Sequence, residues 1–279
     1  MRERHPILRS VIRAVLLIIY LLLAIIPLYW IFVTSIKGAK HIYDFPLVYF
    51  PKDWNFDGYR KLFSFSNFGI YFRNSLLVAV FSSLVAMIIS VLSGFALSRY
   101  KNRKMKKRME LLLYFSQTIP PFIIMVPIFT MFSQLKLTDS LVSLSFVYVA
   151  TVVAFSTIMS KSFFDKVPTS IEEACMIDGC TQIQSLYKVI LPITLPGMAA
   201  IFCFAFINIW NELFLAVMLL MTNSKMTVPV ALNSFISKAG ISWDVMSAGI
   251  IIALLPTMIV FGFGQKYIVA GLTEGSVKE

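Results

Sequence analysis

The stretch KSFFDKVPTSIEEACMIDGCTQIQSLYKVILP, residues 161–192, is a polar interruption between two apolar runs that are each long enough to cross a membrane. Within it, Thr169 and Ser170 are each followed three residues later by an acid, Glu172 and Glu173. This spacing is a doubled capping-box pattern, in which hydroxyl and carboxylate groups satisfy the free amides of a first helical turn. The pattern therefore predicts a helix start near residue 169.

A turn and a second helix are predicted to follow. Gly179 suits the left-handed backbone conformation that commonly ends a helix. Thr181, with Gln184 three residues later, forms another capping-box pattern for a helix that runs toward Pro192. Small residues at the turn would let another surface approach closely, namely Ala174, Cys175, Gly179 and Cys180. We therefore expect a helix, a tight turn and a helix that lie outside the bilayer.

The composition of the whole chain indicates that much of it lies in lipid. Of the 279 residues, 58% are hydrophobic and 14% are charged, whereas a soluble domain has about 45–50% apolar and about 25% charged residues. Six uncharged runs reach the length of a transmembrane helix, about 20 mostly apolar residues. They are Ala14–Val33, Asn74–Ser98, Leu111–Leu135, Ser140–Ser160, Val189–Asn211 and Val245–Gln265. We expect an all-α integral membrane protein with six transmembrane helices.

Several of these runs contain proline, which removes a backbone hydrogen bond and favours a kink. The prolines concerned are Pro27, Pro120, Pro121, Pro127, Pro196 and Pro256. Neighbouring helices can compensate for such breaks. The prolines therefore predict bent spans but no particular function.

The distribution of Lys and Arg predicts the orientation of the spans. With the N-terminus inside, the cytoplasmic segments hold 16 of the 25 Lys and Arg residues and the outer segments hold 9. The run RYKNRKMKKR, residues 99–108, dominates the difference and is interpreted as a topology anchor. Because short cytoplasmic connections carry the excess of positive charge, both termini are predicted to be cytoplasmic. The net charge of +11 lies between apolar runs, which favours a membrane surface over nucleic acid as the partner.

One transmembrane domain is expected at residues 14–268, between a cytoplasmic head at 1–13 and a cytoplasmic tail at 269–279. Its spans are placed at about 14–34, 74–98, 111–135, 140–160, 193–221 and 245–265, with residues 161–192 as a cytoplasmic loop. The basic front of the first span raises the possibility of a signal peptide. Its apolar run is too long for one and no A-x-A-like site follows, so we interpret it as a retained signal anchor.

Residue types for metal binding or catalysis are sparse. The three cysteines, Cys175, Cys180 and Cys203, are odd in number and lack metal-ligand spacing, which argues against a disulfide scaffold or a zinc site. His5 and His41 are the only histidines. The sequence has no G-x-x-x-x-G-K-S/T loop, so P-loop binding of ATP is not expected. We therefore expect a chain that is not an enzyme and that binds no metal or cofactor.

The spacing within residues 161–192 resembles the cytoplasmic signature of ABC importer permeases. That signature reads E-A-A, three residues, G, nine residues, I, one residue, L-P. The matching residues are Glu173-Ala174-Cys175, Gly179, Val189 and Leu191-Pro192, with the family's usual acid before the glycine as Asp178. Two departures, Cys175 for alanine and Val189 for isoleucine, keep small or branched apolar character. The resemblance implies the type I permease fold and a loop that docks into a groove on a cytoplasmic ATPase.

The resemblance assigns this coupling role to eight residues, Glu172, Glu173, Ala174, Cys175, Asp178, Gly179, Leu191 and Pro192. Glu173 would pair with a basic residue of the ATPase, and Gly179 would permit the turn. The alternative interpretation is purely local: the two acids cap a helix and the glycine ends it.

Further stretches resemble the carbohydrate permeases of the maltose type, in particular the shorter, maltose-G-like subunit. They are NSLLVAV (74–80), GFALSRY (94–100), WNELFLAVMLL (210–220), TVPVAL (227–232) and QKYIVAGLTEGSVK (265–278). The resemblance implies a multi-pass subunit of a sugar importer in the bacterial cytoplasmic membrane. Its partners would be a second, homologous permease, two ABC ATPases that hold ATP and Mg, and an extracytoplasmic solute-binding protein. The tail from residue 272 would also lie against the ATPases.

Other functions remain open at this point. Permeases for glycerol phosphate or polyamines use related architecture. A secondary transporter would need coupling acids or histidines at the membrane midplane and usually shows an internal repeat. Only one acid qualifies, and no repeat is visible. A polytopic membrane enzyme would need a cluster of His, Cys or acids, and the sequence shows none.

Glu212 is that acid, and an acid at membrane depth marks a candidate functional site. Asn208, Trp210 and Asn211 surround it in the sequence. Amides, a carboxylate and an aromatic face suit a sugar pathway, so these four residues form a candidate translocation site. Helical spacing implies that not all four face one pore. The alternative is that Glu212 lies near the headgroups or bonds a neighbouring helix.

Overall fold

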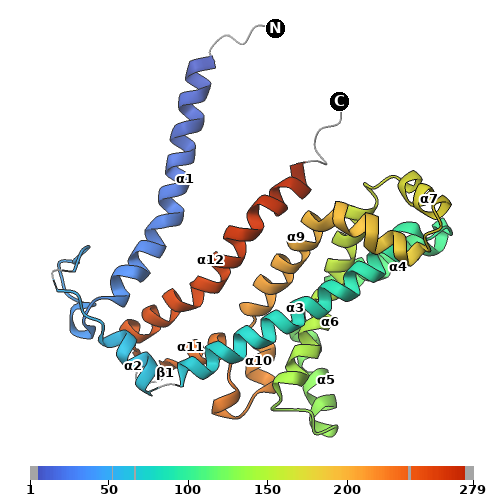
Figure 1. Cartoon of the computed structure of the whole chain (residues 1–279). Helices are drawn as coiled ribbons and strands as arrows, with labels where there is room; N and C mark the ends of the chain where they lie inside the picture. Colours follow the sequence, from blue (N-terminus) through green and yellow to red (C-terminus); the bar gives the residue numbers. More distant parts are fainter. Residues whose placement is uncertain (1–5, 52, 66, 238–239, 274–279) are drawn as a thin grey trace. The chain divides into compact units, whose positions relative to one another are not determined.

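The computed structural model describes residues 6–51, 53–65, 67–237 and 240–273 (Figure 1). In chain order the elements are α1 (Pro6–Ser35), the 3₁₀ helix η1 (Ala39–His41), α2 (Asp57–Phe65), α3 (Phe68–Arg99), α4 (Arg103–Thr118), α5 (Pro121–Gln134), α6 (Leu141–Phe164), α7 (Thr169–Ile177), α8 (Gln182–Ser185), the π-helical turn η2 (Leu186–Ile190), α9 (Leu191–Trp210), α10 (Phe214–Leu219), the 3₁₀ helix η3 (Asn223–Lys225), α11 (Val228–Ser234), β1 (Ile236–Ser237), β2 (Gly240–Ile241) and α12 (Trp243–Thr273). The two short strands pair antiparallel, with Ile236 opposite Ile241.

Within the described residues, five helical segments are long and apolar enough to cross a membrane, and α4 with α5 makes a sixth only as a bent pair. The expected single span over 111–135 is therefore corrected, because α4 and α5 meet at an angle of 90°. Ile119 and Pro120 have extended backbones, with ψ angles of 117° and 132°. Each precedes a proline, which disfavours the helical conformation of the residue before it. Helix α5 then begins at Pro121.

The fifth span also differs from the expectation of 193–221. Helices α8, η2 and α9 form one continuous candidate span, Gln182–Trp210, so the helix begins before Pro192 and runs through it. It ends at Trp210, and the chain breaks before the short helix α10. At the other predicted boundaries, α3 begins at Phe68, α6 continues to Phe164, and α12 extends to Thr273.

The chain divides into two compact units, residues 1–68 with 231–254, and residues 69–230 with 255–279. In the first unit, α2 packs on the start of α12. Lys61 Nζ lies 3.0 Å from the Asp244 carboxylate. Gly58 allows the close approach, because a Cβ there would lie 2.6 Å from the Asp244 carbonyl oxygen. Gly249 likewise faces the side chains of Leu232 and Leu62.

In the second unit, α3 and α6 pack through small residues. The Ser82 hydroxyl donates to the Ser145 carbonyl at 3.1 Å, and the Ser93 and Thr157 hydroxyls lie 2.9 Å apart. A Cβ on Gly94 would lie 2.6 Å from the Ser160 side chain. Lipid gives apolar side chains no hydrophobic reason to pair, so helices in membranes associate through close contact and interhelical hydrogen bonds. These residues supply both.

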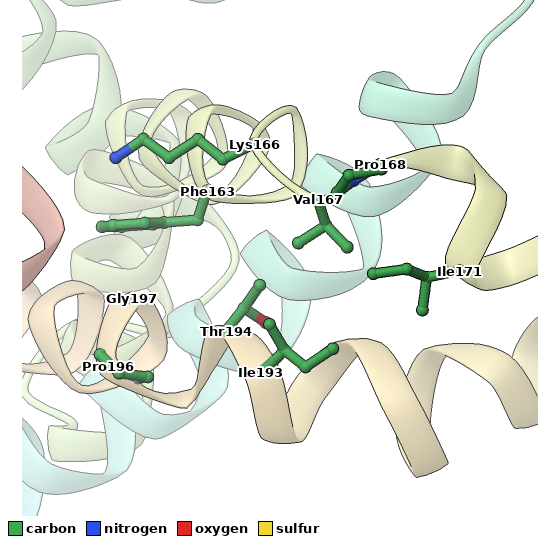
Figure 2. A pocket seen from close by; sticks show the side chains of 9 residues that line it. All are labelled: Phe163, Lys166, Val167, Pro168, Ile171, Ile193, Thr194, Pro196 and Gly197. Carbon is green, nitrogen blue, oxygen red and sulfur yellow. The ribbon is translucent and has the colours of Figure 1, made fainter. Parts of the chain in front are cut away.

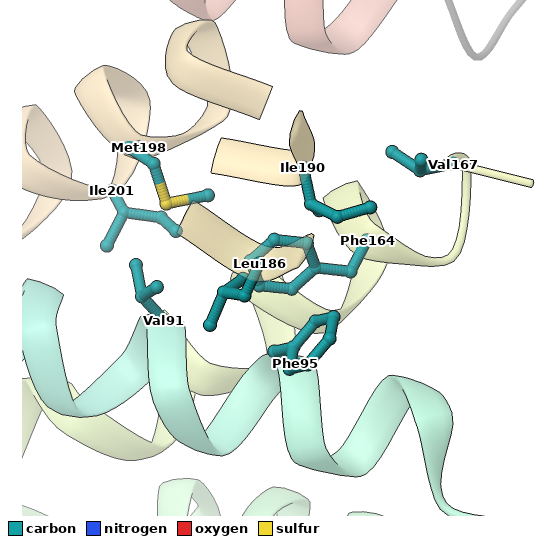
Figure 3. Close-up of a cluster of buried hydrophobic side chains, with 8 residues drawn as sticks. All are labelled: Val91, Phe95, Phe164, Val167, Leu186, Ile190, Met198 and Ile201. Carbon is teal, nitrogen blue, oxygen red and sulfur yellow. The ribbon is translucent and has the colours of Figure 1, made fainter. Parts of the chain in front are cut away.

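One end of this second unit holds an apolar cluster (Figure 3). Phe164, the last residue of α6, is fully buried, and its ring packs edge-on against Phe95 of α3 with centroids 5.5 Å apart. Leu186 and Ile190 of η2 join them. The other members are Val91, Val167, Met198 and Ile201. The cluster joins α3, α6 and α9 at the point where residues 165–181 leave the bundle.

Candidate functional site

The predicted turn after α7 is confirmed. Gly179 has a φ of +86°, the left-handed conformation. Its amide donates to the Met176 carbonyl at 3.1 Å, and the Cys180 amide donates to the Cys175 carbonyl at 3.0 Å. These two bonds define the Schellman motif, which satisfies the free carbonyls at a helix C-terminus. We call residues 165–190, which include this turn, the helix–turn–helix segment.

The two predicted helix starts have different outcomes. The second is confirmed, because Thr181 and Gln184 form a complete capping box. The first is confirmed in position but not in mechanism: α7 begins at Thr169 behind Pro168, and no side chain caps it. Proline suits this boundary because it has no N–H to satisfy. The acids are consequently not caps, and Glu172 has a different partner.

Glu172 forms a buried ion pair with Arg99, the last residue of α3. The two side chains are 6% and 10% exposed. The Arg99 guanidinium also donates to the backbone carbonyls of Phe164 at 3.1 Å and Val167 at 3.0 Å. One cation thereby fastens the end of α3, the end of α6 and the first turn of α7. Arg99 was missed as a site residue because it begins the basic run 99–108, which was interpreted as a topology anchor.

A second set of contacts ties α4 to the same end of the unit. Lys106 donates to the Ser98 carbonyl at 3.0 Å and lies 3.7 Å from Asp165. Lys161 lies 3.1 Å from the Glu110 carboxylate. Burial alone would raise the pKa of Asp165, but hydrogen bonds from Lys161 and Ser98 outweigh it and hold that pKa below its usual value. The basic run 99–108 and the helix–turn–helix segment therefore lie together.

The outer face of α7 has the opposite character. Glu173, Met176 and Ile177 are exposed, and the Ile177 side chain is 86% exposed. Ala174, Asp178 and Gly179 are exposed as well, and Cys175 is half-buried. Met176 and Ile177 thus expose neighbouring apolar side chains outside the predicted spans.

Leu191 and Pro192 lie apart from this face. They belong to the first turn of α9, where Leu191 packs against the apolar cluster and Pro192 is exposed. Seven of the eight predicted coupling residues thus divide into an accessible group on α7 and its turn and a supporting group formed by Glu172 and Leu191, and the eighth, Pro192, is exposed on α9.

A cavity of about 210 Å³ lies between α7 and α9 (Figure 2). Its lining is mainly apolar, and the Lys166 ammonium stands 5.4 Å from the centre of the Phe163 ring. The lining residues are Phe163, Lys166, Val167, Pro168, Ile171, Ile193, Thr194, Pro196 and Gly197. Such a space beside an exposed helix can admit one apolar side chain.

The second candidate site lies at the break between α9 and α10. The Glu212 carboxylate accepts a hydrogen bond from the Tyr148 hydroxyl at 2.7 Å and from the amides of Leu215 at 3.0 Å and Ala216 at 3.3 Å. It therefore caps α10 and ties it to α6. A cavity of about 230 Å³ borders this carboxylate, lined by Gln117, Pro121, Tyr148, Thr151, Val152, Phe155, Phe204, Asn208, Ile209, Glu212 and Leu215.

The other predicted pathway residues do not all face this cavity. Asn208 lines it. Trp210 is 2% exposed, stacks on Phe206 with centroids 5.8 Å apart and meets Phe72 edge-on at 5.5 Å. Asn211 is exposed, and its amide donates to the Ile207 carbonyl at 2.8 Å. Of the four residues, Asn208 and Glu212 line this cavity, and Trp210 and Asn211 do not.

At the other end of α6, Asp139 fastens two connections. Its carboxylate accepts hydrogen bonds from the Thr222 hydroxyl at 2.6 Å and from the Met221 amide at 3.0 Å, and it lies 2.9 Å from Lys225 Nζ. The Thr222 hydrogen bond is the main reason that the pKa of Asp139 is well below its usual value. The Asp139 contacts therefore join the connection before α6 to the connection after α10.

Comparisons with known proteins agree with this architecture. The family model described as "Binding-protein-dependent transport system inner membrane component" matches residues 86–274. Inner membrane ABC transporter permease protein YcjP of Escherichia coli (strain K12) is 32% identical over 266 residues, 94% of each chain. Sulfoquinovosyl glycerol transport system permease protein SmoH of Agrobacterium fabrum is 32% identical over 260 residues, 93% of this chain and 91% of that protein.

Among solved structures, a bacterial ABC transporter involved in the import of the acidic polysaccharide alginate contains a similar chain. The TM-score is 0.81 at 26% identity, over 96% of this chain and 99% of that one. The matched family region includes the helix–turn–helix segment and the cavity at Glu212.

Proposed function

The chain belongs to the family of binding-protein-dependent transport system inner membrane components, and from this premise we propose that it carries sugars as one of two permease subunits of an ATP-driven importer. As an ABC importer permease, it is a multi-pass protein of the cytoplasmic membrane. It is not the catalytic subunit, because ATP is hydrolysed by a separate ATPase. We propose that this partner holds the ATP and Mg.

A carbohydrate as the cargo is supported by two neighbours and by one cavity. SmoH is named for sulfoquinovosyl glycerol transport, and the similar crystal structure concerns alginate import. The cavity at Glu212 offers amide groups from Gln117 and Asn208 beside the rings of Phe155 and Phe204. Amides bind sugar hydroxyls, and aromatic rings pack on sugar faces. Because the Glu212 carboxylate is held by the capping hydrogen bonds of α10, we assign it a positioning role at this cavity.

The exposed face of α7 is the observation that carries the coupling proposal. It presents an acid, Glu173, and an apolar anchor, Ile177, outside the spans. The neighbouring Glu172 is fixed to the bundle through Arg99. A partner that moves α7 would therefore move the ends of α3 and α6 with it. This arrangement supports docking of the ATPase on α7 and transmission of its closure to the spans, which then alternate between inward-open and outward-open states.

The remaining subunits follow from this scheme. We propose a heterodimer with a second, homologous permease, two ATPase subunits below the membrane, and a solute-binding protein on the outer side. The family description itself makes transport dependent on a binding protein. Glu173 pairs with a basic side chain of the ATPase, and Ile177 fills an apolar groove.

Co-purification in gentle detergent tests the proposal. The tagged chain is expected to recover a second permease and an ATPase with a P-loop. Glu173→Lys and Ile177→Ala should each weaken ATPase recovery at least about tenfold, the effect of losing one anchor of an interface. Leu111→Ala is the matched control, because Leu111 is equally apolar and 68% exposed but lies on α4.

Recovery of the second permease should not change in these variants. Uptake of sugars into vesicles that hold the complex and its binding protein then identifies the cargo. A chain that purifies alone and transports without ATP would refute the importer scheme, and equal losses for Ile177→Ala and Leu111→Ala would refute the docking role of α7.

A further inference from the structure

Two cysteines meet across the turn of the helix–turn–helix segment. The bond from the Cys180 amide to the Cys175 carbonyl, 3.0 Å long, closes the Schellman motif around Gly179. In this motif the side chains at the two ends of the six-residue turn come into contact, and they are usually apolar. Here both ends carry thiols. The backbone hydrogen bond therefore brings the two cysteine residues close together.

The two thiols interact and are accessible. The neighbouring Cys180 side chain is the main reason that the pKa of Cys175 is raised. The charge of Asp178 acts in the same direction, and Lys188 acts against it. Both cysteines are free and half-buried, whereas Cys203 is buried within α9. A small reagent outside the bilayer can thus reach the pair but not the third cysteine.

We propose that Cys175 and Cys180 form a reversible modification site, which a small-molecule disulfide oxidises to an intramolecular disulfide. One thiolate attacks a sulfur of the reagent and releases one small thiol. The second thiolate attacks the resulting mixed disulfide and releases the other small thiol. The chain loses two protons and two electrons, and the reagent is reduced to two thiols. A reducing thiol reverses both steps.

Two features favour this reaction over single modification of either cysteine. The turn is already closed by backbone bonds at Gly179 and Cys180, so little conformational freedom is lost when the sulfurs join. The site also needs no partner subunit, because both sulfurs belong to this chain. The inference is therefore independent of the docking role proposed for α7.

The test is the redox equilibrium of the full chain in its native membrane vesicles. The vesicles are equilibrated with mixtures of oxidised and reduced glutathione, free thiols are blocked with a maleimide, and the chain is digested with trypsin. Both cysteines lie on the single peptide between Lys166 and Lys188, and Cys203 lies on another. We expect the peptide 167–188 to become lighter by two hydrogen atoms and to carry no maleimide.

Folded and unfolded chains provide the comparison. The internal disulfide should form in vesicles at an oxidised-to-reduced ratio about tenfold lower than in chain dissolved in SDS, because the turn holds the thiols together. In Cys180→Ser the light peptide should vanish, and Cys175 should carry glutathione or maleimide. Alkylation of the Cys175 left alone in Cys180→Ser should also speed up, because the thiol that raised its pKa is gone.

Equal ratios in vesicles and in SDS would overturn the proposal. A peptide that carries one glutathione on each cysteine would overturn it too, as would a disulfide to Cys203 or to another chain. Loss of ATPase recovery in the docking experiment would not affect this result.

Discussion

At the scale of single residues, the burial of Arg99 with Glu172 decides how α7 is attached. Both side chains are nearly withdrawn from water, and the guanidinium also binds the carbonyls of Phe164 and Val167. Removing one member of a buried pair leaves the other charge uncompensated, which costs more than the pair contributes. Exposed acids one residue away carry no such penalty.

Glu172→Gln is therefore expected to loosen α7 by about 3–5 kcal/mol. The measurement is cleavage within residues 165–181 by a protease in membrane vesicles, together with thermal aggregation in detergent. Glu173→Gln is the control, because Glu173 is exposed and should change stability by no more than about 0.5 kcal/mol. Similar cleavage rates in the two variants would show that the ion pair does not hold α7.

The sequence predicted the turn at Gly179 and the cap at Thr181 because these are local patterns within a few residues. It misassigned Glu172 for the same reason: the residue fits a capping box, and its actual partner lies 73 residues earlier. A pairing over that distance depends on how α3 and α6 pack, which no local pattern contains. The separation of Trp210 from Asn208 was predictable, because helical periodicity alone places them on different faces.

At the scale of elements, the helices approach each other closely because glycines at their contacts have no side chain. Gly94 faces Ser160 of α6, and Gly197 faces the ring of Phe163, where an added Cβ would lie 2.5 Å away. Because these approaches already exclude a methyl group, the spacing of α3, α6 and α9 cannot adjust without moving whole helices. Close packing of this kind makes an interface sensitive to each added atom.

Gly94→Ala is accordingly expected to destabilise the second unit by about 1–3 kcal/mol, the usual cost of overpacking. Gly69→Ala in the same helix is the control, because a Cβ there meets nothing within 4 Å. It should be neutral or stabilising by about 0.5–1 kcal/mol, since alanine is the better helix former. The thermal stability of both variants in detergent distinguishes them, and an unchanged Gly94→Ala would contradict tight α3–α6 contact.

The apolar runs predicted where helices lie but not where they bend. Apolar residues continue through Ile119, Pro120 and Pro121, so hydropathy shows one span where the backbone has two helices at 90°. In the sequence, only the prolines indicated this bend. In the span Gln182–Trp210 the opposite occurred: the helix continues through Pro192 and Pro196, and the π-helical turn η2 precedes the first of them.

At the scale of the whole molecule, charge assigns the two ends of the second unit. The basic run 99–108 lies with the helix–turn–helix segment, bound through Arg99 and Lys106. Asp139 and Lys225 meet at the other end of α6. Positive charge accumulates on the cytoplasmic side of a membrane protein. The end that carries α7 is accordingly the cytoplasmic one under the proposed function, and the Asp139 end faces outward.

Labelling of single cysteines in intact cells checks this orientation. In a chain whose native cysteines are replaced by serine, Lys136→Cys should react with an impermeant maleimide added from outside. Lys104→Cys should react only after the membrane is permeabilised. Both side chains are exposed, so access and not burial decides the result. Labelling of Lys104→Cys in intact cells would reverse the assignment.

The Arg99 contacts also bear on how the chain is made. Arg99 is synthesised 65 residues before Phe164 and 73 residues before Glu172, so it leaves the ribosome without the groups that later surround it. Until α6 has been inserted and α7 translated, its charge remains in water or among headgroups. The attachment of α7 through Arg99 is therefore complete only after α3 and α6 have come together.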